Sequence, residues 1–135
     1  MSNGHGIQIY MMGNELKTHK DLDAWKRSLD LVEMVYKVTN AFPQEELYGL
    51  TNQLRRAAVS IPSNIAEGAA RGSKKEFIQF LHISLGSLSE VETQLIIANR
   101  LGYVNDTNDM DEQLGTIRKL ILGLIRYLRA RDGKE

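Results

Sequence analysis

Only two prolines, Pro43 and Pro62, interrupt this chain of 135 residues. Proline lacks the backbone N–H of a helical hydrogen bond and clashes with the preceding turn, so its scarcity leaves room for long helices. Apolar residues recur at spacings of three and four over most of the chain, and no stretch sustains the alternation of apolar and polar residues that is typical of a strand. The sequence therefore predicts an all-α fold.

The apolar spacing predicts four helices joined by short connections. They span about residues 20–41, 44–70, 73–101 and 109–131. Such an arrangement is typical of an antiparallel up-and-down four-helix bundle. We expect residues 1–17 to form an N-terminal extension, residues 18–131 the bundle and residues 132–135 a C-terminal tail.

Residues that commonly cap helices mark several of these boundaries. Ser73 and Glu76 are expected to form a capping box at the start of the third helix, and Asp109 and Glu112 another at the start of the fourth. Gly102 is expected to end the third helix, because glycine accepts the left-handed conformation that follows many helices.

Pro62 lies inside the second predicted helix. There it removes one backbone donor and pushes against the carbonyl group of Ala58, four residues earlier. Either a kink in a continuous helix or an interruption between Ser60 and Ser63 accommodates the ring, and the sequence leaves both open.

The apolar faces of the first, third and fourth helices are wide. In the first helix the expected buried stripe comprises Leu22, Trp25, Leu29, Val32 and Tyr36, widened by Ala24, Leu31 and Val35. A helix in a monomeric bundle needs a stripe only a little wider than about 100°. Two interpretations follow, a tightly packed monomer with some surface leucines or a second buried face. We expect the second, a homo-oligomer.

Composition excludes several classes of protein. Seventeen Lys and Arg residues balance seventeen Asp and Glu residues, which excludes a strongly basic protein that coats nucleic acid by bulk charge. No apolar run approaches the ~20 residues of a membrane-spanning helix, so we expect no membrane partner. The polar, glycine-rich start lacks the apolar segment of a signal peptide, and we expect a cytoplasmic protein. The absence of cysteine excludes a disulfide scaffold, a thiol nucleophile and a zinc finger.

Motifs that carry catalysis or bind metals fail when their spacing is checked. None of the histidines, His5, His19 and His82, has a second histidine three or four residues away, so no helical zinc pair exists. The acidic run at residues 106–112 lacks the ligand spacing of a calcium loop, and we expect it to stabilise the start of the fourth helix. The glycines of residues 68–74 lack the spacing of a phosphate loop. We therefore expect no enzyme, and no catalytic, cofactor-binding or metal-binding residue.

Basic residues gather in two segments although the net charge is zero. Residues 50–75 carry five basic residues against one acid, and residues 116–135 carry six against two. The candidate nucleic-acid-binding residues are Arg55, Arg56, Arg71, Lys74, Lys75, Arg118, Lys119, Arg126 and Arg129. Those of the fourth helix lie opposite much of its apolar stripe, so we expect them to face solvent. Most basic stripes of this kind only face water and bind nothing. In an oligomer, however, the basic surface is repeated in every copy, which raises the avidity for nucleic acid.

Two acids are expected to serve the structure. Glu92 falls within the apolar arc of the third helix, where a charge needs a partner, and we expect that partner to be Arg55 or Arg56, within the subunit or across an interface. Glu67 and Arg71 lie four positions apart and are expected to pair within the second helix.

A long motif runs through the second helix. Residues 50–71 read LTNQLRRAAVSIPSNIAEGAAR, preceded by Leu22-Asp-Ala-Trp25 and Phe42-Pro43-x-x-Glu46-x-Tyr48-Gly49-Leu50, and followed by Phe77-x-x-Phe80-Leu81 and Gly86-Ser87-Leu88-Ser89-Glu90-Val91-Glu92. Over roughly Leu22 to Leu128 the chain resembles the 23S rRNA intervening-sequence protein family. The run RRAAVSIPSNIAEG at residues 55–68 is too long for chance to explain it.

The resemblance implies a four-helix bundle, and members of this family are similar to the accessory variability protein of diversity-generating retroelements. That relative is a homopentamer that binds nucleic acid and a reverse transcriptase. The resemblance thus implies a pentameric ring and these two classes of partner. The relative is strongly basic whereas this chain is neutral, so only a localised basic surface would serve here.

Two hypotheses of function follow. The first is a non-enzymatic, homo-oligomeric accessory protein, expected to be a pentamer, which binds the RNA or DNA backbone through the fourth helix and the turn between the second and third. The alternative is a protein–protein adaptor without nucleic-acid binding, which docks a partner such as a reverse transcriptase.

Overall fold

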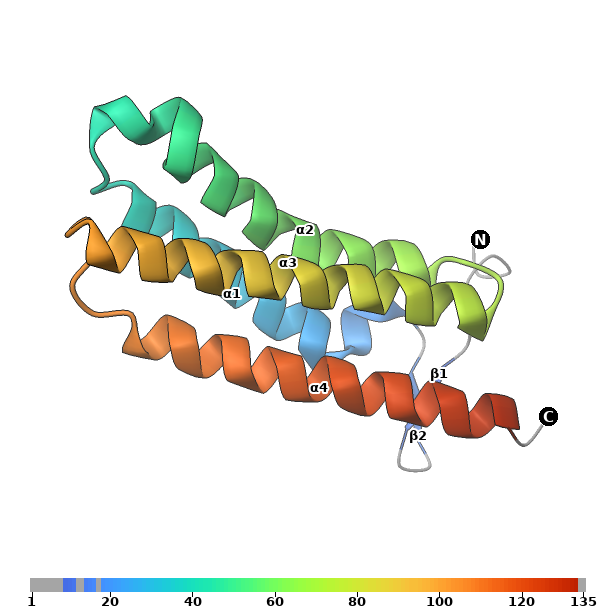
Figure 1. The fold of residues 1–135 in the computed structure, drawn as a ribbon. Coiled ribbons are helices and arrows are strands. Elements are labelled where there is room, and N and C mark those ends of the chain that lie inside the picture. The colour runs from blue at the N-terminus through green and yellow to red at the C-terminus, as the bar shows by residue number, and fades with distance from the viewer. Residues whose placement is uncertain (1–8, 12–13, 17, 134–135) are drawn as a thin grey trace.

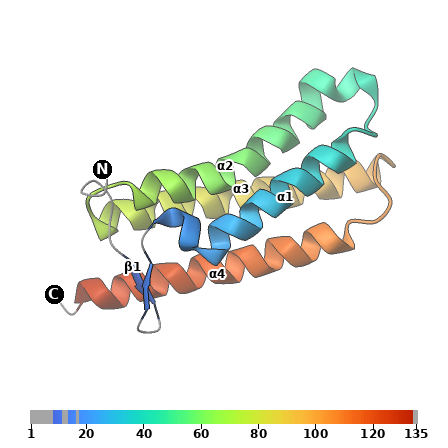
Figure 2. The ribbon, with the colours of Figure 1, turned by 180° about the vertical axis from the view of Figure 1, so that it is seen from behind.

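The computed structural model describes residues 9–11, 14–16 and 18–133, and most of them form helices. The four long helices are α1 (Asp23–Thr39), α2 (Asn52–Ala69), α3 (Lys74–Arg100) and α4 (Asn108–Gly133). Each helix packs against the next in the sequence, and α4 packs against α1, so that the four enclose one core (Figures 1 and 2). The predicted all-α, antiparallel four-helix bundle is confirmed.

A short β-hairpin lies within the stretch that we expected to be an N-terminal extension. Strand β1 (Ile9–Met11) pairs antiparallel with strand β2 (Asn14–Leu16), with Ile9 opposite Leu16. Strands of three residues are too short to show an alternating pattern, so periodicity does not predict them. A 3-10 turn at His19–Asp21 then leads into α1.

Ser73 and Gly102, which were predicted to bound the third helix, mark the two ends of α3 in the structure. The Ser73 hydroxyl oxygen accepts a hydrogen bond from the backbone N–H of Glu76 at 3.1 Å, as a helix cap does. The same hydroxyl donates to the Glu76 carboxylate at 3.2 Å, in place of the second backbone bond of a capping box. At the other end Gly102 adopts a φ of +81°, and this left-handed residue ends the helix as predicted.

The start of α4 differs from the predicted capping box of Asp109 and Glu112. The helix begins at Asn108, so Asp109 lies in its first turn. Thr107 precedes the helix, and its hydroxyl donates to the Asp111 carboxylate at 2.9 Å while its carbonyl accepts from the Asp111 N–H at 2.8 Å. Thr107 and Asp109 are both of residue types that cap helices, and they lie close together. The capping-box spacing to Glu112 led to the prediction of Asp109.

The segment before α2 consists of irregular turns. A 3-10 turn (Gln44–Glu46) and a π turn (Leu47–Thr51) precede the helix, and Gly49 has non-helical angles of φ −112° and ψ −113°. From Asn52 onward α2 runs without a break through Pro62. Of the two alternatives at this proline, interruption is wrong and the kink stays a prediction.

The core lies between the four helices, and all four contribute to it. Its largest fully buried side chains are Leu31, Leu54, Ile61, Ile65, Phe77, Leu81, Leu88, Leu95, Leu114, Ile117 and Ile121. Each side chain of this kind contributes ~1.5–3 kcal/mol relative to leaving it exposed. Burial along this seam is therefore what holds the helices together.

Helix α1 is rotated relative to the stripe that its sequence predicts. Its buried residues are Ala24, Ser28, Leu31, Val35 and Thr39. Leu29 and Tyr36, which were expected in the core, are 38% and 42% exposed. The buried hydroxyls of Ser28 and Thr39 each donate to the backbone carbonyl four residues earlier. Because these bonds satisfy the hydroxyls, two polar residues occupy the core face and the predicted centre of the stripe is wrong.

Helices α2 and α3 make the most extensive contact of the bundle. A Cβ atom added at Gly68 of α2 would lie 2.7 Å from the Cβ atom of Phe80 on α3. Farther along, the hydroxyl of Ser84 on α3 donates to the carbonyl of Ile61 on α2 at 2.9 Å. Small residues at these points let the two helices approach closely.

Candidate nucleic-acid interface

Five of the predicted nucleic-acid-binding residues gather toward one end of the bundle. We call this set the basic end, and it comprises Arg71, Lys74, Lys75, Arg126 and Arg129. Because neighbouring helices are antiparallel, the turn between α2 and α3 and the last turns of α4 lie at the same end (Figure 1). Lys75, Arg126 and Arg129 are exposed.

Arg129 connects α4 to α3 within this region. Its Nη2 atom lies 3.4 Å from Nε2 of His82 on α3. Arginine can only donate, so the imidazole accepts in this contact. His82 therefore contributes an imidazole ring beside the basic end, a role that sequence reasoning missed. The two residues lie 47 positions apart, and no local signal connects them.

Arg71 is held in place at the turn between α2 and α3. Its Nη2 atom lies 3.0 Å from Oε2 of Glu67, which confirms the predicted pair. Its guanidinium carbon also lies 4.9 Å from the centre of the Phe80 ring. The Arg71 side chain is 42% exposed, so it is positioned by two neighbours and still reaches solvent. Glu67 offsets part of its charge.

Lys74 and Lys75 occupy the first turn of α3. Backbone N–H groups that have no helical partner lie in the same turn. The charges of Lys74 and Lys75 add to the positive end of the helix dipole, and Glu76 in the same turn offsets part of them. A phosphate would interact favourably with the two lysines and with the helix N-terminus.

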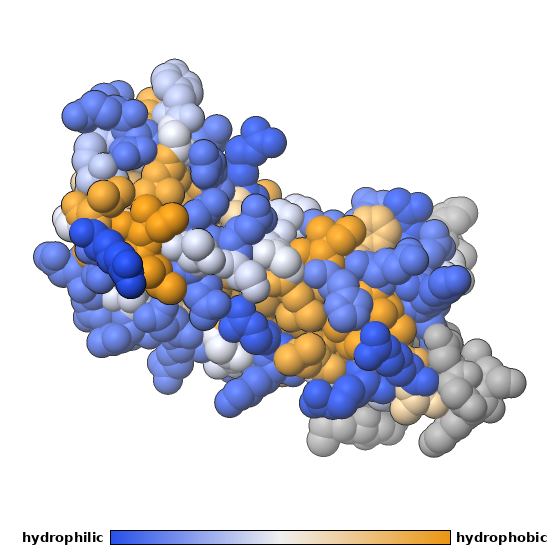
Figure 3. All heavy atoms as spheres, in the orientation of Figure 1, coloured by the Kyte–Doolittle hydropathy of each residue, from blue (hydrophilic) through white to orange (hydrophobic). Residues whose placement is uncertain are grey.

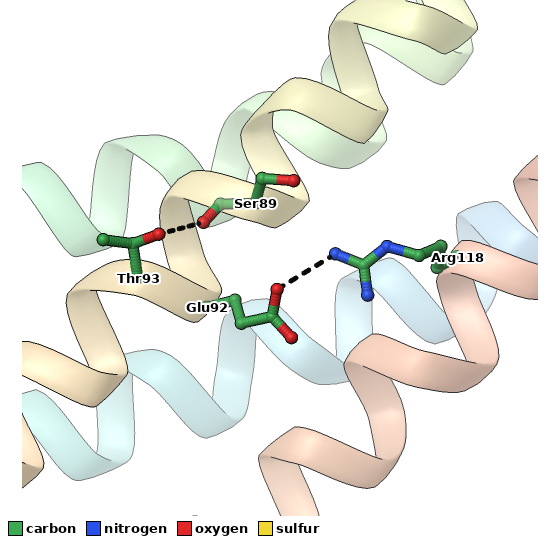
Figure 4. A network of polar contacts seen from close by, with 4 residues as sticks. All are labelled: Ser89, Glu92, Thr93 and Arg118. Atoms are coloured by element: carbon green, nitrogen blue, oxygen red, sulfur yellow. Dashed lines mark hydrogen bonds and ion pairs between the residues drawn. The ribbon is translucent and has the colours of Figure 1, made fainter.

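Arg118 does not join the basic end. Its Nη2 atom lies 3.3 Å from Oε1 of Glu92, across the contact of α4 with α3 (Figure 4). The predicted pairing of Glu92 with Arg55 or Arg56 within the subunit is wrong, because Glu92 lies on the side of α3 that faces α4 whereas both arginines belong to α2. Arg118 is turned only partly to solvent, since its side chain is 31% exposed, and its charge is paired with Glu92.

Arg55 holds α2 against the C-terminal end of α1. Its Nε donates to Oγ1 of Thr39 at 2.8 Å, and its Nη2 donates to Oδ1 of Asn40 at 3.1 Å. Its guanidinium carbon lies 4.5 Å from the centre of the Tyr36 ring. These contacts give Arg55 a structural role within the subunit.

Arg56 and Lys119 are exposed but lie apart from the basic end. Arg56 is in the early part of α2, and the turn with Arg71 follows the other end of that helix. Lys119 is near the middle of α4, two turns before Arg126. The structure thus brings five of the nine candidates together and separates the other four.

The opposite end of the bundle is acidic. Its acids precede α2 and surround the start of α4, and they are Glu45, Glu46, Asp106, Asp109, Asp111 and Glu112. Tyr103 donates its hydroxyl hydrogen to Oε2 of Glu46 at 2.9 Å, and this bond, with burial and the nearby carboxylates, raises the pKa of Tyr103. The zero net charge is therefore a sum over two ends of opposite sign.

Three further properties of the described residues concern a groove, metal binding and membrane crossing. An open groove of about 460 Å³ lies between α1 and α4 and is lined by Arg27, Met34, Asp109, Glu112, Gln113 and Thr116. Among the residues that the structure describes, no three His, Asp or Glu side chains are grouped to hold a metal ion. In the same part of the chain, no helix is both long enough and apolar enough to cross a bilayer.

Comparison with known proteins identifies relatives of this fold. The model of the family described as 23S rRNA-intervening sequence protein matches residues 20–123. The chain is also similar to the crystal structure of a protein of unknown function from the S23 ribosomal protein family of Bacteroides thetaiotaomicron VPI-5482. That similarity has a TM-score of 0.67 and 25% sequence identity, and it covers 76% of this chain and 97% of the other. No curated protein matches the chain. Because the family model spans most of its length, this chain belongs to the 23S rRNA-intervening sequence protein family.

Proposed function

We propose that this chain is a non-enzymatic accessory protein that assembles with copies of itself and binds the phosphate backbone of RNA or DNA through the basic end. The observation that carries the proposal is the gathering of Arg71, Lys74, Lys75, Arg126 and Arg129 toward one end of the bundle. His82 adds a further polar ring beside them.

Zero net charge does not oppose this function, because charge is segregated along the bundle. Helix α3 has 27 residues, which corresponds to about 40 Å at ~1.5 Å per residue. Salt screens exposed charges beyond ~8–10 Å at physiological ionic strength. A phosphate at the basic end therefore interacts with the cations there, and the carboxylates at the far end contribute little.

Self-assembly would multiply this contact. Ten large apolar side chains of the described residues are more than a third exposed, which supports a second buried surface. We propose a ring of five, the size that the resemblance to the retroelement accessory protein implies. Cyclic symmetry places equivalent surfaces on the same side of a ring, so five basic ends would act on one nucleic acid at once.

The test is binding of a labelled single-stranded RNA and a DNA duplex, followed by fluorescence anisotropy over a series of salt concentrations. Replacing Arg126 and Arg129 together by Gln is expected to weaken binding by about tenfold or more at low salt. The slope of log affinity against log salt should fall by ~0.7–0.9 for each phosphate group that the variant no longer neutralises.

A matched control removes two exposed cations outside the basic end. The double variant Lys37→Gln and Arg56→Gln changes the net charge by the same amount and is expected to bind like the wild type. Equal weakening by both double variants would contradict a localised site. Wild-type protein that binds neither nucleic acid at low salt would refute the proposal, and a protein partner retained after nuclease and high salt would then favour the adaptor alternative.

A further inference from the structure

Large apolar side chains are exposed along the outer side of α3 and at the residue that follows it. Ile83, Ile97 and Leu101 lie within about 40° of one another around the helix axis and are 49%, 42% and 55% exposed. Figure 3 shows hydrophobic atoms at the surface on the face where α3 lies in front. We call these three residues the α3 ridge. Isolated apolar residues are normal on a protein surface, but three along one side of a helix form a surface that burial would stabilise.

A second apolar surface lies where α1 meets α2. It comprises Leu29, Tyr36 and Val59, which are 38%, 42% and 40% exposed, and we call it the α1–α2 patch. The stacking of Arg55 on Tyr36 shows that the two helices lie side by side there. Because they run antiparallel, Val59, one turn after Arg55, lies level with the part of α1 between Tyr36 and Leu29.

The α3 ridge and the α1–α2 patch are separate surfaces of the bundle. Helix α1 packs against α2 and α4, and α3 packs against the same two helices, so α1 and α3 are diagonal across the core (Figure 1). One partner molecule seated on the α3 ridge therefore leaves the α1–α2 patch exposed. A chain with two such surfaces can cover both only by contacting two neighbours.

Charge distinguishes the two surfaces and suits them to one another. Glu90 is exposed on the outer side of α3 and lies seven residues from both Ile83 and Ile97, so the three are stacked along one line of the helix. Its carboxylate makes no hydrogen bond or ion pair with any described residue. The α1–α2 patch carries the opposite charge, the guanidinium of Arg55 above Tyr36.

We infer that the α3 ridge of one copy packs on the α1–α2 patch of the next copy, with Glu90 facing Arg55. This inference rests on the self-assembly proposed above and specifies its geometry. The contact is head-to-tail because its two halves are different surfaces, and it forms a closed ring when the rotation between copies divides a full turn, as in the proposed ring of five. Each copy then buries both apolar surfaces, which a single symmetric contact of one surface with itself does not achieve.

The test uses two variants, each of which disables one half of the contact. Ile97→Arg places a charge in the α3 ridge, and Leu29→Arg places one in the α1–α2 patch. Both sites are exposed, so the fold should tolerate the change, and circular dichroism checks this. Each variant alone is expected to be a monomer of 15.3 kDa by light scattering at micromolar concentration. Mixed together, they should form a one-to-one heterodimer through the two intact halves.

The mixture separates the possible arrangements. If each surface instead pairs with itself, each variant forms its own homodimer and mixing yields no heterodimer, which overturns the head-to-tail pairing while self-assembly stands. Wild-type protein that is monomeric refutes self-assembly and this inference with it. The control Leu47→Arg changes an apolar residue of similar exposure, 37%, outside both surfaces and should assemble like the wild type.

A charge reversal tests the polar part of the contact. Glu90→Arg is expected to dissociate the assembly, because it places two cations opposite one another across an apolar contact. Assembly of Glu90→Arg at wild-type strength would overturn the facing of Glu90 and Arg55.

Discussion

The guanidinium of Arg118 on α4 lies 3.3 Å from the carboxylate of Glu92 on α3, with the two side chains 31% and 47% exposed. Ion pairs exposed to this degree contribute ~0–1 kcal/mol to stability, because solvent screens them and ordering both side chains costs entropy. The pair therefore matters less for the fold than for the surface of α4. It pairs the charge of Arg118, whereas Arg126 and Arg129 farther along α4 are exposed in the basic end.

Arg118→Gln is accordingly expected to leave RNA affinity within about twofold of wild type, because the charge that it removes was already paired with Glu92. Arg126→Gln removes an exposed cation of the same helix and is expected to weaken binding more. Anisotropy titrations at one fixed salt concentration compare the two variants. A loss of affinity in Arg118→Gln as large as that in Arg126→Gln would show that phosphate contacts extend to the middle of α4.

Gly68→Ala is expected to destabilise the protein by about 1–3 kcal/mol, because the new methyl group would lie 2.7 Å from the Cβ atom of Phe80 and push α2 away from α3. Gly115→Ala is the matched control on α4, where nothing lies within 4 Å of the added atom. That change should stabilise the helix by about 0.5–1 kcal/mol. Urea unfolding measures both, and equal effects would contradict a tight crossing at Gly68.

Arg55→Gln is expected to lower the free energy of unfolding by about 1–2 kcal/mol, because it removes the bonds to Thr39 and Asn40 and the stacking on Tyr36. Its neighbour Arg56 is exposed. Arg56→Gln should therefore change stability by no more than about 0.5 kcal/mol. Thermal and urea unfolding compare the two. Similar stabilities for both variants would mean that Arg55 is dispensable at the end of α1.

The free energy of unfolding is expected to depend on pH through His19. Its ring packs edge-on against Trp25 at 5.1 Å, and partial burial, with a smaller effect of the Lys20 charge, lowers the pKa of His19 below 6.5. Between the folded and unfolded pKa values the unfolded chain binds more protons, so the free energy of unfolding rises with pH across that window. The stability that the folded state has with His19 neutral is fully present above pH 6.5, and it is lost as the pH falls through the pKa of His19 in the folded state.

His19→Gln is therefore expected to reduce the difference in melting temperature between pH 7.5 and pH 5.5, whatever it does to stability at either pH alone. Lys20→Gln removes only the smaller cause and should keep most of that difference. Scanning calorimetry at the two pH values is the measurement. An unchanged difference in His19→Gln would assign the pH dependence to other groups.

Local sequence signals were sufficient for most of the interactions that join residues within one or two helical turns. The periodicity predicted the four helices, Ser73 predicted the start of α3, and the spacing of Glu67 and Arg71 predicted their ion pair. In each case the partners are fixed by helix geometry alone. The same reasoning failed at the start of α4, where Thr107 and Asp109 are both able to cap and sequence alone does not rank them.

For the candidate interface, the sequence predicted which cations exist but not which of them act together. Arg55, Arg118 and Arg126 look equivalent along the chain. Only packing shows that the first stacks on Tyr36, the second pairs with Glu92 and the third is exposed. These roles depend on contacts between residues 19 to 26 positions apart, which helical periodicity does not encode.

The sequence by itself determined that this chain is all-α, that its helices are long and that its basic residues occupy two segments, because these properties follow from the conformational preferences and order of neighbouring residues. The tertiary structure alone decided how α1 is rotated, burying Ser28 and Thr39 and leaving Leu29 and Tyr36 at the surface. It also decided that charge is divided between the two ends. The reason is that rotation and register are set by how whole helix surfaces fit against one another, and a single helix read alone does not contain that fit.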